Sequence, residues 1–211
     1  MRVTVFGATG GIGTHVVRQA LDAGHEVVAV VRDPARLDVP AQPGLSVVRA
    51  DVMDPDAIVP AAEGANAVVS ALGPRPAGPP NVCSDGAASI LRAMYKTGTR
   101  RLVVVSASLY FIDAGESPVN RYLAKPIIQR ILRAPAADIR RMEQEIRVST
   151  TDWTLMRPPR LLDKPGRGRG HYRTAIDRNV GMGIARADVA DAILYALADP
   201  ATIGHTLGVG N

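Results

Sequence analysis

Short apolar runs alternate with segments of helical periodicity along the chain. The runs are rich in β-branched residues and lie at 2–6, 26–31, 45–49, 67–72, 101–106, 152–157 and 206–209. Between them, helices are expected over a first segment that ends at Gly24 and near 55–63, 82–97, 136–148 and 188–198. Nearly continuous apolar runs are typical of strands buried on both faces. The alternation predicts an α/β fold, a doubly wound, mostly parallel sheet with helices on both faces.

Loops interrupt this alternation in three places. Residues 73–81 hold four prolines, and 164–171 (KPGRGRGH) form a basic stretch, so both predict loops. Regularity also weakens over 107–135, where glycine and proline recur. At 211 residues we expect one domain over 1–211.

Charge and composition narrow the partners. The net charge is +5 and the aromatic content 4%, so anionic partners are favoured while platforms for stacking bases are few. Nucleotide phosphates satisfy the charge as well as nucleic acid does, and nucleic acid is the weaker hypothesis. Without a long apolar span, with a strand starting at residue 2 and with Cys83 as its one cysteine, the chain is expected to be cytoplasmic and to have no membrane partner.

A glycine-rich turn joins the first strand to the first helix. Gly7, Gly10 and Gly13 have the spacing GxxGxxG in a strand–turn–helix setting. Gly7 suits the tight turn, Gly10 lets backbone approach a pyrophosphate, and Gly13 allows close packing of helix on strand. The amide groups of the first helical turn add an anion site. The turn therefore predicts a dinucleotide site.

The end of the second strand bears on the choice of nucleotide. Many dinucleotide folds place here an acidic residue that bonds the adenine ribose, whereas this strand ends at Val31 and is followed by Arg32. An arginine forms charge-assisted bonds to a 2′-phosphate, which favours NADP. Asp33 keeps NAD open if its carboxylate faces the ribose. Asp51 leaves the third strand where an adenine amino group is expected.

Seven segments in the same order resemble the NAD(P)-binding atypical short-chain dehydrogenases, the NmrA-like group and its biliverdin-IXβ/flavin reductase relatives. They are FGATGGIG, GHEVVAVVRDPARL, RADVMDPDAI, VVSALG, VVVSAS, DWTLMRPPRLLD and RADVADAIL. The resemblance implies a Rossmann domain whose cofactor contacts are Gly7, Thr9, Gly10, Gly11, Ile12, Gly13, Arg32, Asp51, Val52, Ala71, Leu72, Gly73 and, facing the nicotinamide, Ser106.

The same resemblance implies the reacting end of the site. Ser108 matches the active-site serine of the flavin-reductase relatives, while Arg160 stands where those relatives carry a histidine. Tyr110, Arg160 and His171 are candidate substrate residues, in a pocket expected from segments near 107–135 and 157–180. Tyr122 and Lys125 are one residue too close for a Tyr-xxx-Lys pair, and Pro126 disfavours helical backbone at Lys125.

This shortage of a proton donor favours hydride transfer to an acceptor that solvent can protonate. We therefore expect an NADPH-dependent oxidoreductase that acts on a small conjugated or aromatic acceptor of the flavin, quinone or tetrapyrrole type. An acceptor with an anionic group is one option. The alternative is an NmrA-like redox sensor that binds the dinucleotide without turnover. We expect no metal ligands, and a monomer or a small homo-oligomer.

Overall fold

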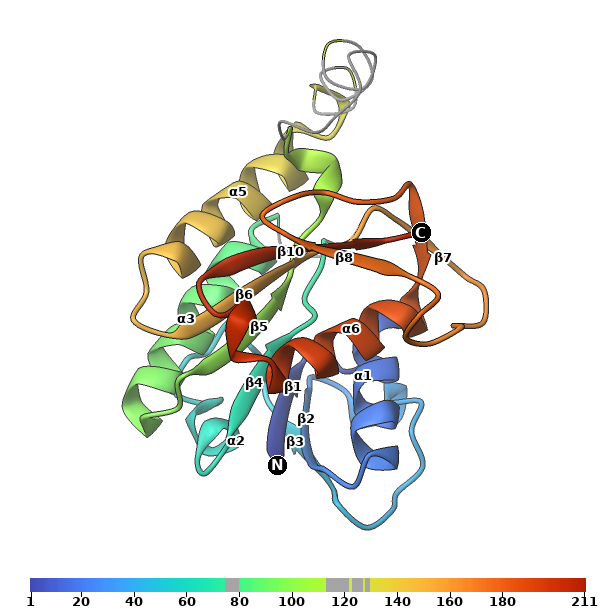
Figure 1. The fold of residues 1–211 in the computed structure, drawn as a ribbon. Coiled ribbons are helices and arrows are strands. Elements are labelled where there is room, and N and C mark those ends of the chain that lie inside the picture. The colour runs from blue at the N-terminus through green and yellow to red at the C-terminus, as the bar shows by residue number, and fades with distance from the viewer. Residues whose placement is uncertain (75–79, 113–121, 123–126, 128–129) are drawn as a thin grey trace.

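The computed structural model describes residues 1–74, 80–112, 122, 127 and 130–211. Eight strands of this part form one sheet in the order β3-β2-β1-β4-β5-β6-β10-β8 (Figure 1). They are β1 (Arg2–Phe6), β2 (Glu26–Val31), β3 (Leu45–Arg49), β4 (Ala67–Ser70), β5 (Arg101–Val105), β6 (Asp152–Arg157), β8 (Arg173–Ile176) and β10 (His205–Gly210). All neighbours pair in parallel except β8, which is antiparallel to β10. The predicted doubly wound, mostly parallel Rossmann sheet is confirmed.

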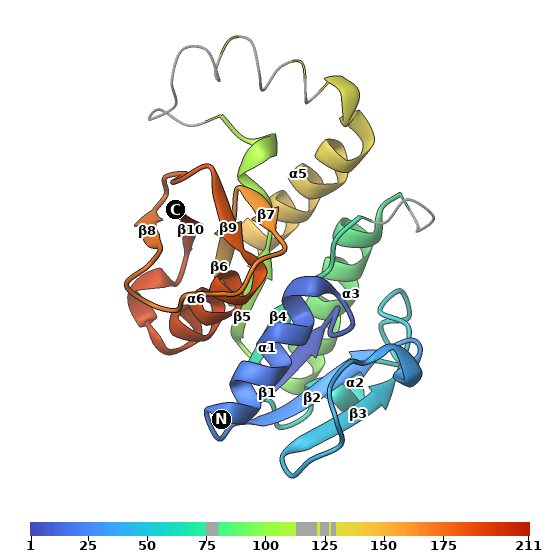
Figure 2. The same ribbon diagram turned by 90° about the vertical axis from the view of Figure 1, so that its right-hand side faces the viewer.

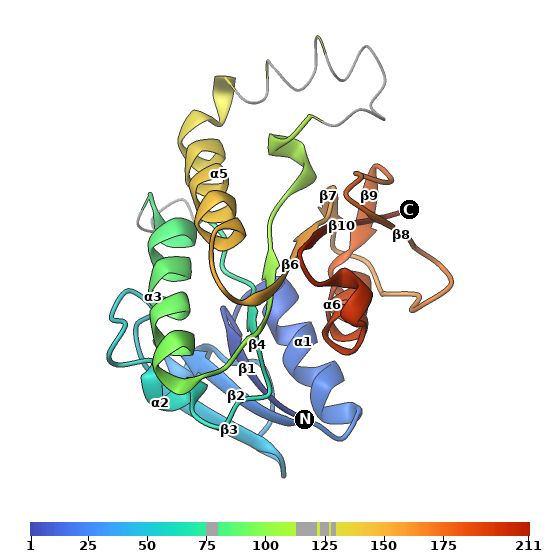
Figure 3. The same cartoon turned by 60° about the vertical axis from the view of Figure 1, so that its left-hand side comes forward.

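Helices cover both faces of the sheet. α1 (Gly11–Asp22) and α6 (Arg186–Ala198) pack together on one face, and α3 (Val82–Thr97) and α5 (Arg133–Arg147) pack together on the other, with the short α2 (Val59–Ala62) beside α3. Figure 2 shows α1 in front of β1 and β2, and Figure 3 shows the α3–α5 layer and the α1–α6 layer on opposite sides of the strands. The 3₁₀ turns η1 (Pro34–Arg36), η2 (Ser108–Tyr110) and η4 (Pro200–Thr202) lie in the connections.

The two faces of the strands build two separate cores. Val27, Ala29 and Val31 of β2 pack into the core under α1 and α6, whereas Val28 and Val30 pack into the core under α3 and α5. This alternation between two apolar faces explains why the strands read as continuous apolar runs. Trp153 and Met156 of β6 are buried on opposite faces.

The structure corrects several element boundaries. The helix predicted over 55–63 is only α2, because Oδ1 of Asp54 accepts from the amides of Asp56 and Ala57 and caps a turn instead. α5 and α6 begin three and two residues before the predicted 136 and 188. The predicted strand at 67–72 ends at Ser70, so Ala71 and Leu72 lie in the connection after β4.

Three short strands were not predicted: β7 (Arg160–Leu162) and β9 (Gly183–Ala185), which pair with each other, and the edge strand β8. Each has three or four residues, and long-range pairing decides their conformation. No helix in the described part of the chain is long and apolar enough to cross a membrane.

Candidate dinucleotide site

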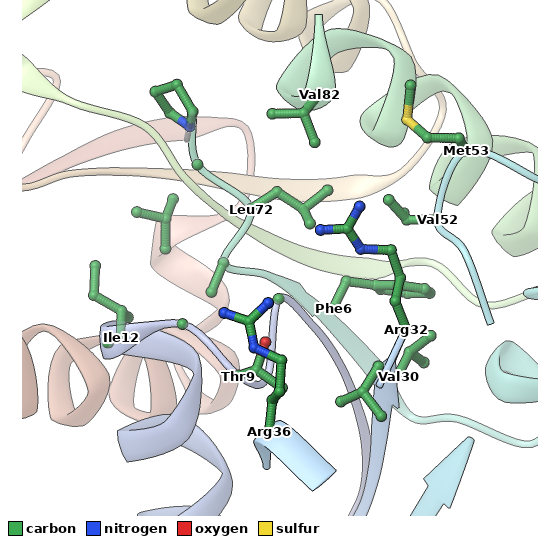
Figure 4. A pocket seen from close by; sticks show the side chains of 18 of the residues that line it. Phe6, Thr9, Ile12, Val30, Arg32, Arg36, Val52, Met53, Leu72 and Val82 are labelled. Atoms are coloured by element: carbon green, nitrogen blue, oxygen red, sulfur yellow. The ribbon is translucent and has the colours of Figure 1, made fainter. Parts of the chain in front are cut away.

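A cavity of about 380 Å³ opens at the carboxyl ends of β1, β2, β4 and β5 (Figure 4). This is the edge at which doubly wound sheets bind ligands. Twelve of the predicted cofactor residues line it, and Gly13 does not. The twelve are Gly7, Thr9, Gly10, Gly11, Ile12, Arg32, Asp51, Val52, Ala71, Leu72, Gly73 and Ser106. The structure therefore brings these residues together, and their binding role stays a prediction.

Two glycines are required by the turn itself. Gly7 has φ +74°, and a Cβ there would lie 2.6 Å from the carbonyl oxygen of Ala71. A Cβ on Gly13 would lie 2.1 Å from the carbonyl oxygen of Gly7, so any side chain at Gly13 would push α1 off β1. The absence of Gly13 from the cavity wall follows, because its space is filled by the turn.

Gly10 is required for a different reason. A Cβ there would lie 3.1 Å from its nearest neighbour, the carbonyl oxygen of Gly7, a tight but less severe contact. Gly10 is the N-cap of α1, so no side chain satisfies the first amides of the helix, and no acidic residue lies in the first turn. An open backbone with free helix-end amides is suited to a phosphate group. The residues present therefore fit a dinucleotide diphosphate.

Two arginines extend into the cavity from the connection after β2. Figure 4 shows Arg32 directed toward Val52 and Leu72, and Arg36 directed toward Thr9. Oδ1 of Asp33 accepts from the amide of Ala35 at 3.1 Å and so caps η1, which carries Arg36. The Asp33 carboxylate is thus engaged through one oxygen, and Asp33 still lines the cavity beside the two arginines. The sequence reasoning missed Arg36, although its place four residues after Arg32 behind Asp33-Pro34 was a usable signal.

The far wall beside the arginines is mostly apolar. Phe6, Val30, Val52 and Met53 line it, and Asp51 is held by its Oδ1, which accepts from the amide of Met53 at 3.0 Å. An apolar wall beside the carboxylate of Asp51 suits an adenine ring.

A buried ionic network supports the other end of the cavity. The hydroxyl of Ser106 donates to Oε1 of Glu143 at 2.6 Å, and Arg157 donates to the same carboxylate from Nε at 2.9 Å. Glu143 is 2% exposed. The Arg157 guanidinium also stacks on Phe111, 3.6 Å from the ring centroid. Sequence reasoning missed Glu143, which lies on the same helix face as the apolar stripe formed by Ile139 and Ile146.

The structure separates the predicted substrate residues. Tyr110 lines the cavity, whereas Ser108 is buried in η2, with its amide donating to the carbonyl of Pro158 at 3.0 Å, and is not part of the cavity wall. Arg160 and His171 are exposed and lie outside the wall, where Leu161 stands instead. The roles of Ser108, Arg160 and His171 stay predictions.

Tyr110 is the phenol nearest the reacting end. Burial, with a smaller contribution from Cys83, raises the pKa of Tyr110 above its usual value. The phenol therefore stays protonated at neutral pH. Tyr122 is 76% exposed and also lies outside the cavity wall, and Lys125 lies outside the described residues.

The one cysteine and the arginines in and after the basic stretch do not line the cavity. Cys83 is fully buried, and burial together with Asp138 raises the pKa of its thiol, as expected for an inert cysteine. Arg167 and Arg169 of the basic stretch are exposed, as are Arg173 and Arg178 beyond it, and Arg169 stacks on Tyr195 with 4.2 Å to the ring centroid.

Comparison with known proteins defines the class. A model of the NAD(P)H-binding family matches residues 7–200, so the chain belongs to the NAD(P)H-binding family. The predicted NAD(P)H-binding group and its dinucleotide cofactor are thereby confirmed.

Relatives and solved structures agree with this class. The chain is 28% identical to the photosystem II assembly factor Ycf39 of Synechocystis over 160 residues, 74% of this chain but 44% of that protein. It is 27% identical to YwnB of Bacillus subtilis over 95% of this chain and 93% of that protein. The oxidoreductase ylbE of Lactococcus lactis superposes with a TM-score of 0.82 at 18% identity, over 100% of this chain and 91% of that chain. A Veillonella parvula short-chain dehydrogenase/reductase in complex with NADP gives 0.77 at 22% identity, over 100% of this chain and 94% of that chain.

Proposed function

We propose that the protein is an NADPH-dependent reductase that transfers hydride to a small conjugated or aromatic acceptor. The observation that carries this proposal is one continuous cavity that runs from the two arginines after β2, past the helix end at Gly10, to Ser106 and Tyr110 after β5. A bound nicotinamide would supply the hydride, and residues of the chain would orient the nicotinamide and the acceptor.

The preference for NADPH rests on Arg32 and Arg36. Both extend into the cavity on the side of β2, where they outnumber Asp33, which also lines the cavity and caps η1 through Oδ1. Two guanidinium groups form charge-assisted hydrogen bonds to a phosphate monoester. Their hydrogen bonds to the neutral hydroxyl of an unphosphorylated ribose are weaker.

The acceptor class follows from the protonation chemistry at the end of β5. Tyr110 has a raised pKa, and the nearby Arg140 donates to its backbone carbonyl at 3.1 Å without lowering the pKa of the phenol. A phenol whose pKa no cation lowers is a poor proton donor to an alkoxide. A flavin, quinone or tetrapyrrole spreads the incoming charge over a π system and takes its proton from solvent. Tyr110 then serves as a neutral wall that can donate a hydrogen bond.

Ser106 and Ser108 have different proposed tasks. Ser106 holds the end of β5 through Glu143 and excludes water beside the nicotinamide. Ser108, two residues on, is proposed to bond the acceptor, which requires η2 to adjust when the acceptor binds.

The second candidate is a dinucleotide-binding regulator without turnover. The similarity to Ycf39, an assembly factor, favours it. The two candidates share the nucleotide site and differ only in whether hydride leaves it.

Oxidation of NADPH, followed at its near-ultraviolet absorbance with flavin, quinone and dichlorophenol-indophenol acceptors, decides between them. The reductase proposal predicts turnover with at least one acceptor, faster with NADPH than with NADH. Nucleotide binding without turnover on any acceptor would overturn it in favour of the regulator.

A further inference from the structure

A third arginine lies over the glycine turn. Arg186 is the first residue of α6, and its side chain crosses Gly11, the first residue of α1. Its Cδ and Nε lie 2.6 and 2.8 Å from the position that a Cβ on Gly11 would take. Arg186 also lines the cavity. Its charged group therefore stands beside the helix end that is open to a phosphate.

The partner of Arg186 is an exposed carboxylate. Nη1 of Arg186 forms an ion pair with Oδ1 of Asp163, the residue directly after β7. The side chain of Arg186 is 28% exposed and that of Asp163 is 89% exposed, and Asp163 is not part of the cavity wall. Exposed ion pairs of this kind contribute little free energy, about 0–1 kcal/mol. Arg186 is held in place without being committed to Asp163.

The backbone around Arg186 is fixed independently of that ion pair. The carbonyl of Ala187 accepts from Nε2 of Gln19 on α1 at 2.9 Å. Asp188, 1% exposed, accepts on Oδ1 from the amides of Arg167 and Gly168 at 2.7 and 2.8 Å. The N-terminus of α6 is thus attached to α1 and to the loop after Asp163, so the guanidinium can change partner while its backbone stays in place.

The charge of Arg186 acts on α1. Burial lowers the pKa of His15, and the neighbouring Arg18 and Arg186 lower it further. The field of Arg186 thus adds to the positive end of the α1 dipole at the glycine turn.

We propose that Arg186 is a ligand of the cofactor diphosphate and that it exchanges Asp163 for phosphate oxygens when the dinucleotide binds. A guanidinium bonds phosphate oxygens bidentately, more strongly than it bonds one exposed carboxylate oxygen. The diphosphate is common to NADP and NAD, so Arg186 contributes to both, whereas Arg32 and Arg36 act on NADP alone. This inference rests on the dinucleotide site and is independent of the acceptor.

Calorimetric titration of the full-length chain with NADPH and with NADH tests it. Arg186→Met removes the charge and keeps the apolar stem over Gly11. We expect the affinity for both nucleotides to fall about tenfold or more, by similar factors. Arg186→Lys, which keeps a point charge, is expected to recover part of the loss.

Asp163→Asn distinguishes an Arg186 that leaves Asp163 for the phosphate from an ion pair that only stabilises the structure. With the competing carboxylate neutralised, both nucleotides are expected to bind as tightly as in the parent or more tightly. The matched control is Arg18→Met, which also removes one positive charge. Arg18 lies on α1, forms an ion pair with the exposed Asp38 and does not line the cavity. Its nucleotide affinities are expected to stay within about twofold of the parent.

Binding measured over a range of salt concentrations adds a readout that misfolding does not imitate. Loss of one phosphate contact makes the affinity of Arg186→Met less salt-dependent than that of the parent. Parent-like affinity in Arg186→Met, an unchanged salt dependence, or an Asp163→Asn variant as weak as Arg186→Met each overturns the inference. Binding by the parent with no acceptor turnover contradicts only the reductase proposal.

Discussion

The hydroxyl of Ser106 and the carboxylate of Glu143 are joined by a buried hydrogen bond of 2.6 Å. Ser106 directly follows β5 on the cavity wall, and Glu143 lies in α5. Arg157 at the end of β6 bonds both oxygens of the same carboxylate. One buried acid therefore holds together the two strand ends and the helix that frame the reacting part of the cavity.

Glu143→Gln is predicted to destabilise the protein by about 3 kcal/mol. Glutamine keeps an acceptor for Ser106, but the Arg157 side chain, 14% exposed, is left with an uncompensated charge. Urea denaturation measures the loss. The control on the same helix is Glu145→Gln, whose pair with Arg141 is more exposed and is predicted to cost under about 1 kcal/mol. Equal losses in the two variants would contradict the role given to Glu143.

Gly10→Ala and Gly13→Ala are predicted to fail in different ways. An alanine at Gly13 meets backbone at 2.1 Å, so we expect a severe loss of folding stability. An alanine at Gly10 meets backbone at 3.1 Å and covers the open helix end, so we expect a folded protein with weak NADPH binding. Thermal melting and calorimetry on both variants check this. A Gly10→Ala variant that binds NADPH as well as the parent would remove the phosphate role of the turn.

Arg32→Ala is predicted to lower the affinity for NADPH about 10- to 100-fold and to leave the affinity for NADH nearly unchanged. The reason is that only NADPH carries the 2′-phosphate. Arg36→Ala is predicted to act in the same direction. Equal losses for both nucleotides would place the two arginines elsewhere on the cofactor.

Ser108→Ala is predicted to lower kcat up to about tenfold while leaving the Kd for NADPH intact, as expected for one lost hydrogen bond to the acceptor. Stopped-flow reduction of the acceptor by preformed protein–NADPH complex measures it. Parent-like rates would make Ser108 a structural residue of η2.

Asp177 predicts a pH dependence of stability. Burial alone would raise the pKa of its carboxyl, but the amide of Thr206 and His205 outweigh burial and lower it below the ordinary 3.8. A lowered folded pKa means stability that is present above 3.8 and lost as pH falls through the folded value. Asp177→Asn should therefore narrow its gap from the parent as pH drops below about 4. A gap that stays constant from neutral to acid pH would refute this assignment.

The elements that could be predicted from the sequence are those fixed by interactions between residues close together in the chain. The strands 26–31, 45–49 and 152–157 and the helix 82–97 were predicted with their observed bounds, because runs of β-branched apolar residues and helical periodicity are local patterns. The glycine turn and Arg32 were equally visible, since one short segment carries the motif.

Long-range contacts explain what the sequence did not reveal. Arg186 contacts Gly11 because α6 packs on α1. Glu143 on α5 bonds Ser106 and Arg157, which lie at the ends of two strands. The short strand β7 forms only because β9 pairs with it. None of these partners is close in the chain, so no spacing rule links them. Part of the expected pocket segment 107–135 lies outside the described residues.

The most direct test of the central claim, that the cavity at the ends of β1, β2, β4 and β5 is an NADPH site, is calorimetric titration of the pure protein with NADPH and NADH. One NADPH is predicted to bind per chain, about tenfold or more tightly than NADH. The absence of binding heat and of any thermal stabilisation with both nucleotides would contradict the claim.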